Sequence, residues 1–311
     1  MQASTELHQK LILADARFAP GNVWFVQSTH ANAGDSAGKG QTPDAPFSTI
    51  DYAVGQCTAD QGDLIIVLPG HVETVIAAAG LDLDVAGITI IGIGNGNLRP
   101  QINFTTATTA DMDVDAANIT MDNFRFTGGF DALAGPIDIN AASFTLRNFI
   151  TEDVTGQAVD FIVTDANADY LTIEDWEHRG ASGAGADTAL SIVGGDHITV
   201  RNFAIFGNFA VAAIENVTTA CVNLSIYGDV TSFIQNGLDS TTPVAVTLVS
   251  TSTGFVGPNI YVRLGVDSTS NTVNITEAFV GAAMQFMQPL AICNLGGEVA
   301  MNSNITATTD A

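Results

Sequence analysis

The feature that most constrains the fold is a short motif that recurs about every 26 residues through the middle of the chain. It reads apolar-Thr-apolar-x-Asn-aromatic, and its starts from residue 119 onward are separated by 25, 27, 27 and 26 residues. The copies begin at Ile88, Ile119, Phe144, Leu171, Ile198 and Leu224. Alternation of apolar and polar residues at period two is typical of a strand with one buried face. We therefore expect short strands stacked copy on copy.

Each copy follows another short strand after a small or polar turn, as residues 112–114 and 137–139 illustrate. No helical stretch separates the strands between residues 88 and 230, which argues against strand–helix–strand units. A coil of this length cannot bury its apolar face alone, and stacking on its neighbours supplies the core. The repeat thus predicts an all-β fold, a parallel β-helix with about 26 residues per coil.

The repeat also predicts which side of each strand is buried. Positions one and three should point inward, and positions two and four outward, with a column of hydroxyls from Thr120 to Ser225 at position two. Position four alternates in charge and predicts a ladder of surface ion pairs, whereas position five suits the left-handed backbone of a corner. The aromatic residue that follows should lie inside. Position four is occupied by Asp122, Arg147, Glu174 and Arg201. Position five is occupied by Asn123, Asn148, Asp175 and Asn202.

The repeat divides the chain into three parts. Residues 1–21 form an N-terminal arm, which either anchors the body or is a disordered tail. Residues 22–237 form the β-helix, including a capping helix near 46–57 with Ser48 as its N-cap. Residues 238–311 leave the period and are predicted to be a non-repetitive β-rich region with strands near 244–249, 259–264 and 272–275.

The apolar stretch 278–293 in this last region is either core or a subunit interface, and we favour the interface. The residues proposed for it are Met284, Phe286, Met287 and Leu290.

The start of the stack resembles a known family. Residues 43–73 are similar to the opening of pectate-lyase-like right-handed β-helix proteins, and the resemblance covers about residues 22–235. The matching positions are Asp44, Pro46, Phe47, Thr49, Ile50, Ala53, Gly62, Asp63, Pro69 and Gly70. That superfamily includes lyases, hydrolases, tailspikes and non-enzymatic virion proteins, so the resemblance implies a right-handed β-helix rather than a particular chemistry.

Two further stretches, residues 69–102 and 128–142, look like a group of tailed-phage proteins of this fold. This resemblance implies a virion or virion-associated role. Trimeric closure is frequent among such proteins, so we expect a homotrimer that contacts other virion proteins such as the capsid. A host surface glycan is the further partner if the chain is a receptor-binding protein.

Composition disfavours several other partners. The chain has 33 acidic and 9 basic residues and a net charge of −24, so nucleic acids and anionic membrane surfaces are poor candidates. The apolar runs are short, and the N-terminus lacks a basic start followed by an apolar core. We therefore expect neither a transmembrane segment nor a signal peptide. The expected location is the virion, after synthesis in the host cytoplasm.

No motif in the sequence identifies a reaction. Catalysis in the pectate-lyase-like family uses a cationic base near acidic groups, and Arg179 lies outside the regular charge ladder, at what reads as a turn. Together with Asp175, Glu177 and His178, it is the strongest catalytic candidate. The favoured interpretation of these four residues is a surface turn.

A second candidate site is the alternating run of Asp111, Asp113 and Asp115, whose side chains share one strand face. Oxygen-rich clusters suit Ca²⁺ or Mg²⁺, although a solvated strand face explains the same pattern and is favoured. We accordingly expect no cofactor, with Ca²⁺ or Mg²⁺ as the alternative.

The main functional hypothesis is a non-enzymatic structural protein of a phage virion, either a head decoration or a head-attached fibre. The compact length, the lack of a catalytic motif and an acidic surface that keeps exposed copies soluble support it. The alternative is a receptor-binding tailspike that cleaves bacterial surface polysaccharide. A cellular polysaccharide lyase is a third possibility, against which the missing secretion signal counts.

Overall fold

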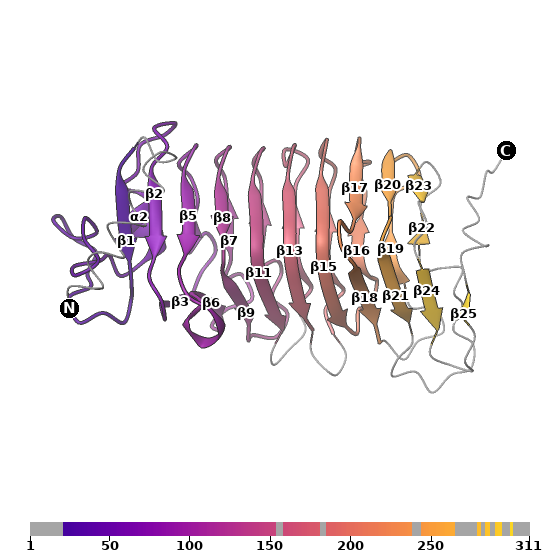
Figure 1. Ribbon diagram of the computed structural model, residues 1–311, viewed down its shortest axis with the longest axis horizontal. Coiled ribbons are helices and arrows are strands. Elements are labelled where there is room, and N and C mark those ends of the chain that lie inside the picture. Colours follow the sequence, from indigo (N-terminus) through magenta and orange to yellow (C-terminus); the bar gives the residue numbers. More distant parts are fainter. Residues whose placement is uncertain are drawn as a thin grey trace.

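The computed structural model describes residues 21–153, 158–180, 185–237 and 244–264, together with residues 279–280, 284–286, 290–293 and 299–300. These residues form a right-handed parallel β-helix, an elongated stack of coils that runs from the N-terminal to the C-terminal end (Figure 1). Neighbouring strands pair in parallel, apart from the last pair. The fold class predicted from the repeat is therefore confirmed.

Each coil contributes one strand to a sheet of eight strands and a longer stretch to a sheet of 17 strands. The smaller sheet contains β4 (Leu81–Asp82), β7 (Met112–Val114), β10 (Ile137–Ile139), β12 (Asp160–Thr164), β14 (Thr188–Ile192), β16 (Ala212–Asn216), β19 (Val244–Thr247) and β22 (Phe279–Val280).

The larger sheet has two columns of strands, which three long strands join. The first column contains β1 (Val23–Val26), β2 (Leu64–Val67), β5 (Thr89–Gly92), β8 (Thr120–Asp122), β17 (Leu224–Tyr227), β20 (Gly254–Val256) and β23 (Met284–Phe286). The second contains β3 (Val72–Val75), β6 (Gln101–Phe104), β9 (Arg125–Gly128), β18 (Ser232–Asn236), β21 (Ile260–Leu264), β24 (Leu290–Cys293) and the antiparallel β25 (Val299–Ala300). The strands that span both are β11 (Thr145–Asp153), β13 (Thr172–Arg179) and β15 (Thr199–Gly207).

The register of the first column matches the repeat. Thr120, Thr145, Thr172, Thr199 and Ser225 lie side by side on successive strands. The residues on either side of each of them, at positions one and three, are fully buried in a continuous hydrophobic core. The predicted inward and outward positions are therefore confirmed.

The corners between the two columns have the left-handed backbone that position five predicts. Asn123, Asn148, Asp175 and Asn202 have φ values between 51° and 68°. Their neighbours in sequence are buried aromatic residues, and the rings of Phe149 and Trp176 stack 5.7 Å apart. A second left-handed column was not predicted: the residue before position one has φ of 58° to 61° at Asn118, Ser143, Tyr170, His197 and Asn223.

A short helix, α2 (Ile50–Val54), lies at the N-terminal end of the stack (Figure 1). Ile50, Ala53 and Val54 join the hydrophobic core, as expected for a capping helix. The N-cap is Thr49 and not Ser48, because the Thr49 side chain accepts a hydrogen bond from the Tyr52 amide at 3.2 Å. Ser48 instead donates its amide to Asp35.

The parallel pairing continues beyond residue 238, where the sequence period fades. Strands β19, β20 and β21 pair with β16, β17 and β18, and β22 to β24 pair with them in turn. Ile226 lies opposite Val256, so this coil takes 30 residues instead of about 26. The irregularity at the C-terminal end is thus one of coil length and not of strand pairing. The arm before residue 21 and the strand expected at 272–275 lie outside the described residues.

Candidate functional site

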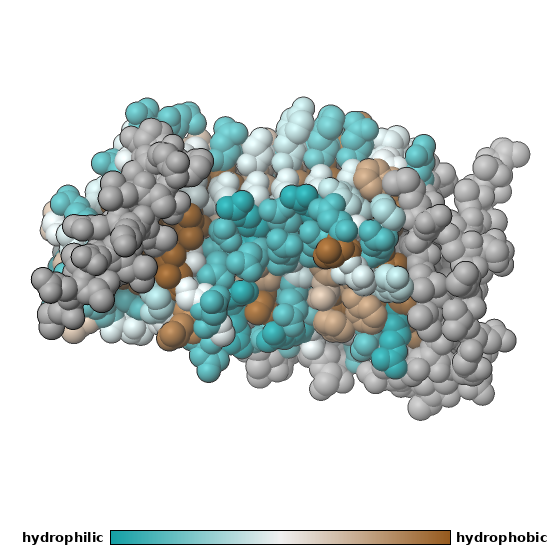
Figure 2. Space-filling model, viewed as in Figure 1, coloured by the Kyte–Doolittle hydropathy of each residue, from teal (hydrophilic) through white to brown (hydrophobic). Residues whose placement is uncertain are grey.

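The outward-facing side chains of the second column change in character along the stack. They include charged residues on the middle coils and aromatic residues toward the C-terminal end. The face of the molecule seen in Figure 2 is hydrophilic at mid-length and carries more hydrophobic residues toward the C-terminal side. In chain order these side chains include Arg125, Glu152, Glu177, Arg179, Phe206, Phe233 and Tyr261. The face therefore presents two candidate sites.

At the charged end, Glu152 accepts hydrogen bonds from two arginines on neighbouring coils. It is buried on β11 and contacts the guanidinium of Arg125, with Nε 3.0 Å away, and that of Arg179, with Nη1 2.7 Å away. Arg179 Nε also donates to Glu177 Oε1 at 2.7 Å. These contacts tie three successive coils together.

The same contacts decide what Arg179 can do chemically. Its hydrogen bond with Glu177, and then the one with Glu152, raise its pKa above the ordinary value, so the guanidinium stays protonated. A base must give up its proton before it can abstract another. Arg179 forms ion pairs with both glutamates, and it is the last residue of β13 rather than part of a turn.

The four residues of the predicted catalytic group do not converge. Arg179 and Glu177 contact each other, but Asp175 lies at a left-handed corner with an exposed side chain. His178 points to the opposite side of β13, into the core, where it is fully buried. Alternation along a strand separates neighbouring residues in this way.

His178 belongs to a buried hydrogen-bonded group. Its Nδ1 lies 2.8 Å from Thr151 Oγ1, which in turn accepts a hydrogen bond from Trp176 Nε1 at 2.8 Å. Burial lowers the pKa of His178 to about 3, so the ring is neutral near pH 7. Its Nε2 has no hydrogen-bond partner within the described part of the chain. The surrounding rings of Phe161 and Phe209 make this a packing position.

An acidic ladder occupies the smaller sheet. Asp82, Asp113 and Asp138 lie side by side on β4, β7 and β10. Burial, followed by repulsion from Asp111 and Asp138, raises the pKa of Asp113 to about 7. The flanking Asp111 accepts a hydrogen bond from the Ala79 amide at 2.5 Å, and Asp115 accepts one from Asn140 at 3.2 Å.

Asp111, Asp113 and Asp115 do not make a metal-binding cluster. Throughout the described ranges, no three His, Cys, Asp or Glu side chains are grouped so that they can hold a metal ion. The expectation of no cofactor, with Ca²⁺ or Mg²⁺ as the alternative, stays a prediction.

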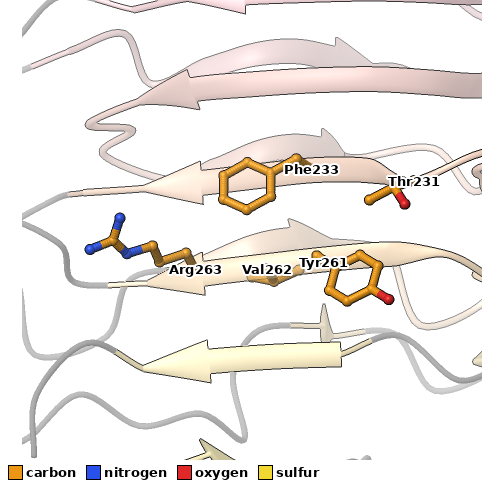
Figure 3. A pocket seen from close by; sticks show the side chains of 5 residues that line it. All are labelled: Thr231, Phe233, Tyr261, Val262 and Arg263. Atoms are coloured by element: carbon orange, nitrogen blue, oxygen red, sulfur yellow. The ribbon is translucent and has the colours of Figure 1, made fainter. Parts of the chain in front are cut away.

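At the aromatic end, a cavity of about 380 Å³ opens on the outer face of β18 and β21. Figure 3 shows the rings of Phe233 and Tyr261 on the two adjacent strands, with Arg263 farther along β21 and its guanidinium pointing away from both rings. Thr231 and Val262 complete the lining. The ring of Phe206 on β15 lies 5.3 Å from that of Phe233 and extends the aromatic surface by one coil. Phe206 is 37% exposed and Tyr261 40% exposed, so the rings face solvent.

Arg263 differs from the arginines of the charged ladders. Arg125, Arg147, Arg179 and Arg201 each form ion pairs with carboxylates on neighbouring strands or turns. Among the residues that the structure describes, Arg263 has no ion-pair partner. Its guanidinium is a positive charge at the edge of an apolar cavity.

Sequence reasoning missed this aromatic cavity. The signal available was the outward parity of Phe233 and Tyr261, but the longer coil hides the register that would align them. Of the proposed interface residues, Met284 and Phe286 belong to β23 and Leu290 to β24, whereas Met287 lies outside the described residues. The subunit interface stays a prediction.

Comparisons with known proteins add little to this geometry. No family model and no curated protein matches the chain. Among solved structures, a rhamnogalacturonan lyase is similar, with a TM-score of 0.42 and 12% identity over 86% of this chain and 87% of that chain. Likeness at this level carries no conclusion about activity.

None of the helices in the described residues is long and apolar enough to cross a bilayer.

Proposed function

We propose that this chain is a non-enzymatic structural protein of a phage virion, a head decoration or a head-attached fibre. The observation that carries the proposal is the use of the arginines on the outer faces of the larger sheet. Arg125, Arg147, Arg179 and Arg201 all bind carboxylates of neighbouring coils, so these charges serve the stack and none is poised for a reaction. The resemblance of residues 69–102 and 128–142 to tailed-phage proteins supports the virion as the location.

A homotrimer is part of this proposal, with the segment 278–293 as the subunit contact. Sedimentation equilibrium of the purified full chain tests it. A mass three times that of the 32.3 kDa chain is expected, and a monomer at micromolar concentration would remove the trimer.

The second candidate function is a receptor-binding tailspike that degrades a bacterial surface polysaccharide. The aromatic cavity on β18 and β21 favours it, because exposed rings on a groove are typical of a ligand surface. This alternative requires that the protein release oligosaccharides from host envelope material.

Quantitative mass spectrometry of purified virions separates the two functions. We expect copy numbers in the range of the major capsid protein for a head decoration. A copy number nearer that of a tail fibre would favour the tailspike and lead to polysaccharide cleavage assays. Absence of the chain from washed virions would refute both virion functions.

A further inference from the structure

We propose that residues 1–20 of this chain dock on an apolar strip on the outer face of its first coils. The strip lies on β1, β2 and β5, at the N-terminal end of the larger sheet. It consists of the side chains of Val23, Phe25, Leu64, Ile66, Leu68, Ile91 and Ile93. The inference concerns what covers this face, and it does not depend on a role in a virion.

The register shows that the strip faces away from the core. Successive side chains of a strand point to opposite sides of the sheet. Ile65 and Ile90 are each next to a strip residue in sequence, and both belong to the main hydrophobic core. The strip residues therefore point outward. Figure 2 shows hydrophobic residues at the surface near the position that Figure 1 gives to β2 and β5.

The same outward columns are polar farther along the stack. The column that carries the ion-pair ladder from Asp122 onward begins on β1, β2 and β5 with Phe25, Ile66 and Ile91. The column of hydroxyls likewise begins with Val23 and Leu64. Outward positions that meet water are charged or carry hydroxyls on the middle coils, so the apolar start of both columns indicates a covered face.

The strip is buried within a single chain. Phe25, Leu64 and Ile66 are each 3% exposed, although they point away from the core. Within the described ranges, the apolar residues packed against these side chains belong to the strip itself. One chain therefore supplies the cover, and a second copy is not needed for it.

Topology leaves the N-terminal segment as the occupant. The other ranges outside the described residues follow β11, β13, β18 and β21, none of which pairs with β1, β2 or β5. Residues 1–20 instead lead directly into β1. An extended residue spans about 3.3 Å and neighbouring strands are ~4.8 Å apart, so the segment is long enough to cross all three strands. Its attachment to β1 also makes docking intramolecular, which favours it over a free partner.

The sequence of the segment fits an apolar strip on an acidic protein. Its two acidic and two basic residues cancel, so the whole net charge of −24 belongs to the rest of the chain. Docking therefore adds nothing to the repulsion among carboxylates. The segment also supplies apolar side chains that gain free energy on leaving water. These are Leu7, Leu11, Ile12, Leu13 and Phe18.

Limited proteolysis of the full chain tests the docking. Trypsin cleaves after Lys10 and Arg17, the two basic residues of the segment, and mass spectrometry follows the loss of the intact N-terminus. A docked segment should be cleaved at least about tenfold more slowly than a synthetic peptide of residues 1–20, which corresponds to about 1.4 kcal/mol of docking free energy. Equal rates for the chain and the peptide would overturn the proposal.

Two variants locate the contact. Ile66→Ser makes the centre of the strip polar, and Leu11→Ser makes the segment more polar without altering the β-helix. Both should bring cleavage after Arg17 closer to the rate of the peptide. The matched control is Val72→Ser on β3, which changes a 44% exposed apolar residue outside the strip and should leave the rate unchanged. An equal increase in the control, or no increase in either variant, would contradict docking on the strip.

Sedimentation velocity of the same variants tests the competing occupant, a second copy of the chain. The proposal expects the wild type and Ile66→Ser to have the same oligomeric state. If Ile66→Ser dissociates an oligomer, the strip is an interface between copies and docking of residues 1–20 is refuted.

Discussion

Inside the stack, Thr151 links the ring nitrogens of Trp176 and His178. Its hydroxyl accepts a hydrogen bond from Trp176 Nε1 at 2.8 Å and lies 2.8 Å from His178 Nδ1. His178 Nε2 has no partner among the described residues, although it is fully buried. Leaving one ring nitrogen unpaired costs about 1–3 kcal/mol, but charging the ring would cost far more.

This residue makes the stability of the fold depend on pH. The pKa of His178 is about 3 when folded and 6.5 ordinarily, so between these values the unfolded chain binds more protons. Stability should therefore fall as the pH drops below about 7, by about 2–3 kcal/mol at pH 4.5 from this group. Urea unfolding of the wild type and of His178→Phe measures it, and the variant should lack this part of the slope. His178→Gln, which is polar but does not titrate, should lack it too, and wild-type slopes in both variants would contradict the assignment.

Within a strand, inward and outward positions of the repeat differ in how well they tolerate substitution. Leu146 points into the core and is fully buried, whereas its neighbour Arg147 faces out with a 44% exposed side chain and contacts Asp122 at 3.0 Å. A partly exposed ion pair contributes about 0–1 kcal/mol, while burying an ionised carboxylate without a partner is far more costly. One residue along the strand thus separates a mild substitution from a disruptive one.

The paired substitutions Arg147→Glu and Leu146→Asp test this difference. Arg147→Glu should lower the free energy of unfolding by about 1 kcal/mol, because it removes the contact with Asp122 and adds repulsion. Leu146→Asp should prevent folding. Far-UV circular dichroism and urea unfolding report both effects, with Arg147→Gln as the control that removes the contact without adding repulsion. Equal losses from the two changes would contradict the inward and outward assignment.

The acidic ladder on β4, β7 and β10 gives the opposite dependence on pH from that of His178. The pKa of Asp113 is raised from 3.8 to about 7, so the folded state holds the proton more tightly and stability falls as the pH rises through 7. Asp113→Asn should therefore be more stable than the wild type at pH 8, with a smaller difference at pH 5. Urea midpoints at the two pH values measure this. Asp122→Asn, which removes a paired carboxylate, should be destabilising at pH 8, and the same sign for both variants would refute the ladder's role.

These elements also show how far the sequence alone predicts the structure. The length of a coil, the column of hydroxyl side chains and the left-handed Asn corners could be predicted from the sequence, because each coil repeats the same residue type at the same position. The second left-handed column could not, because Tyr170 and His197 lack the Asn or Gly that usually marks such a backbone. His178 was predicted to be a turn or surface residue because the repeated motif ends near Trp176. Strand β13 in fact continues to Arg179, and only its pairing with β11 and β15 reveals that length.

For the whole molecule, the balance of charge decides whether added salt raises or lowers the stability of the fold. The arginines of the ladders neutralise a few carboxylates, but 33 acidic residues face only 9 basic ones. The remaining carboxylates repel one another along a stack in which each coil lies close to the next. Screening by salt weakens both this repulsion and the attraction within the exposed ion pairs. Because the repulsion involves many more charges than the ion pairs do, its loss is the larger effect.

Adding salt should therefore stabilise the β-helix. We expect the thermal unfolding midpoint to rise as NaCl increases from about 0.02 M to about 0.5 M, because the screening length falls from roughly 20 Å to roughly 4 Å over that range. Differential scanning calorimetry at pH 8 measures the shift, and Asp113→Asn should show a smaller one because it has one fewer charge in the ladder. Arg147→Gln, which adds one to the net negative charge, should show a larger one. A midpoint that falls with NaCl would mean that the ion-pair ladders outweigh the repulsion, and the charge balance would then be a source of stability and not a burden on it.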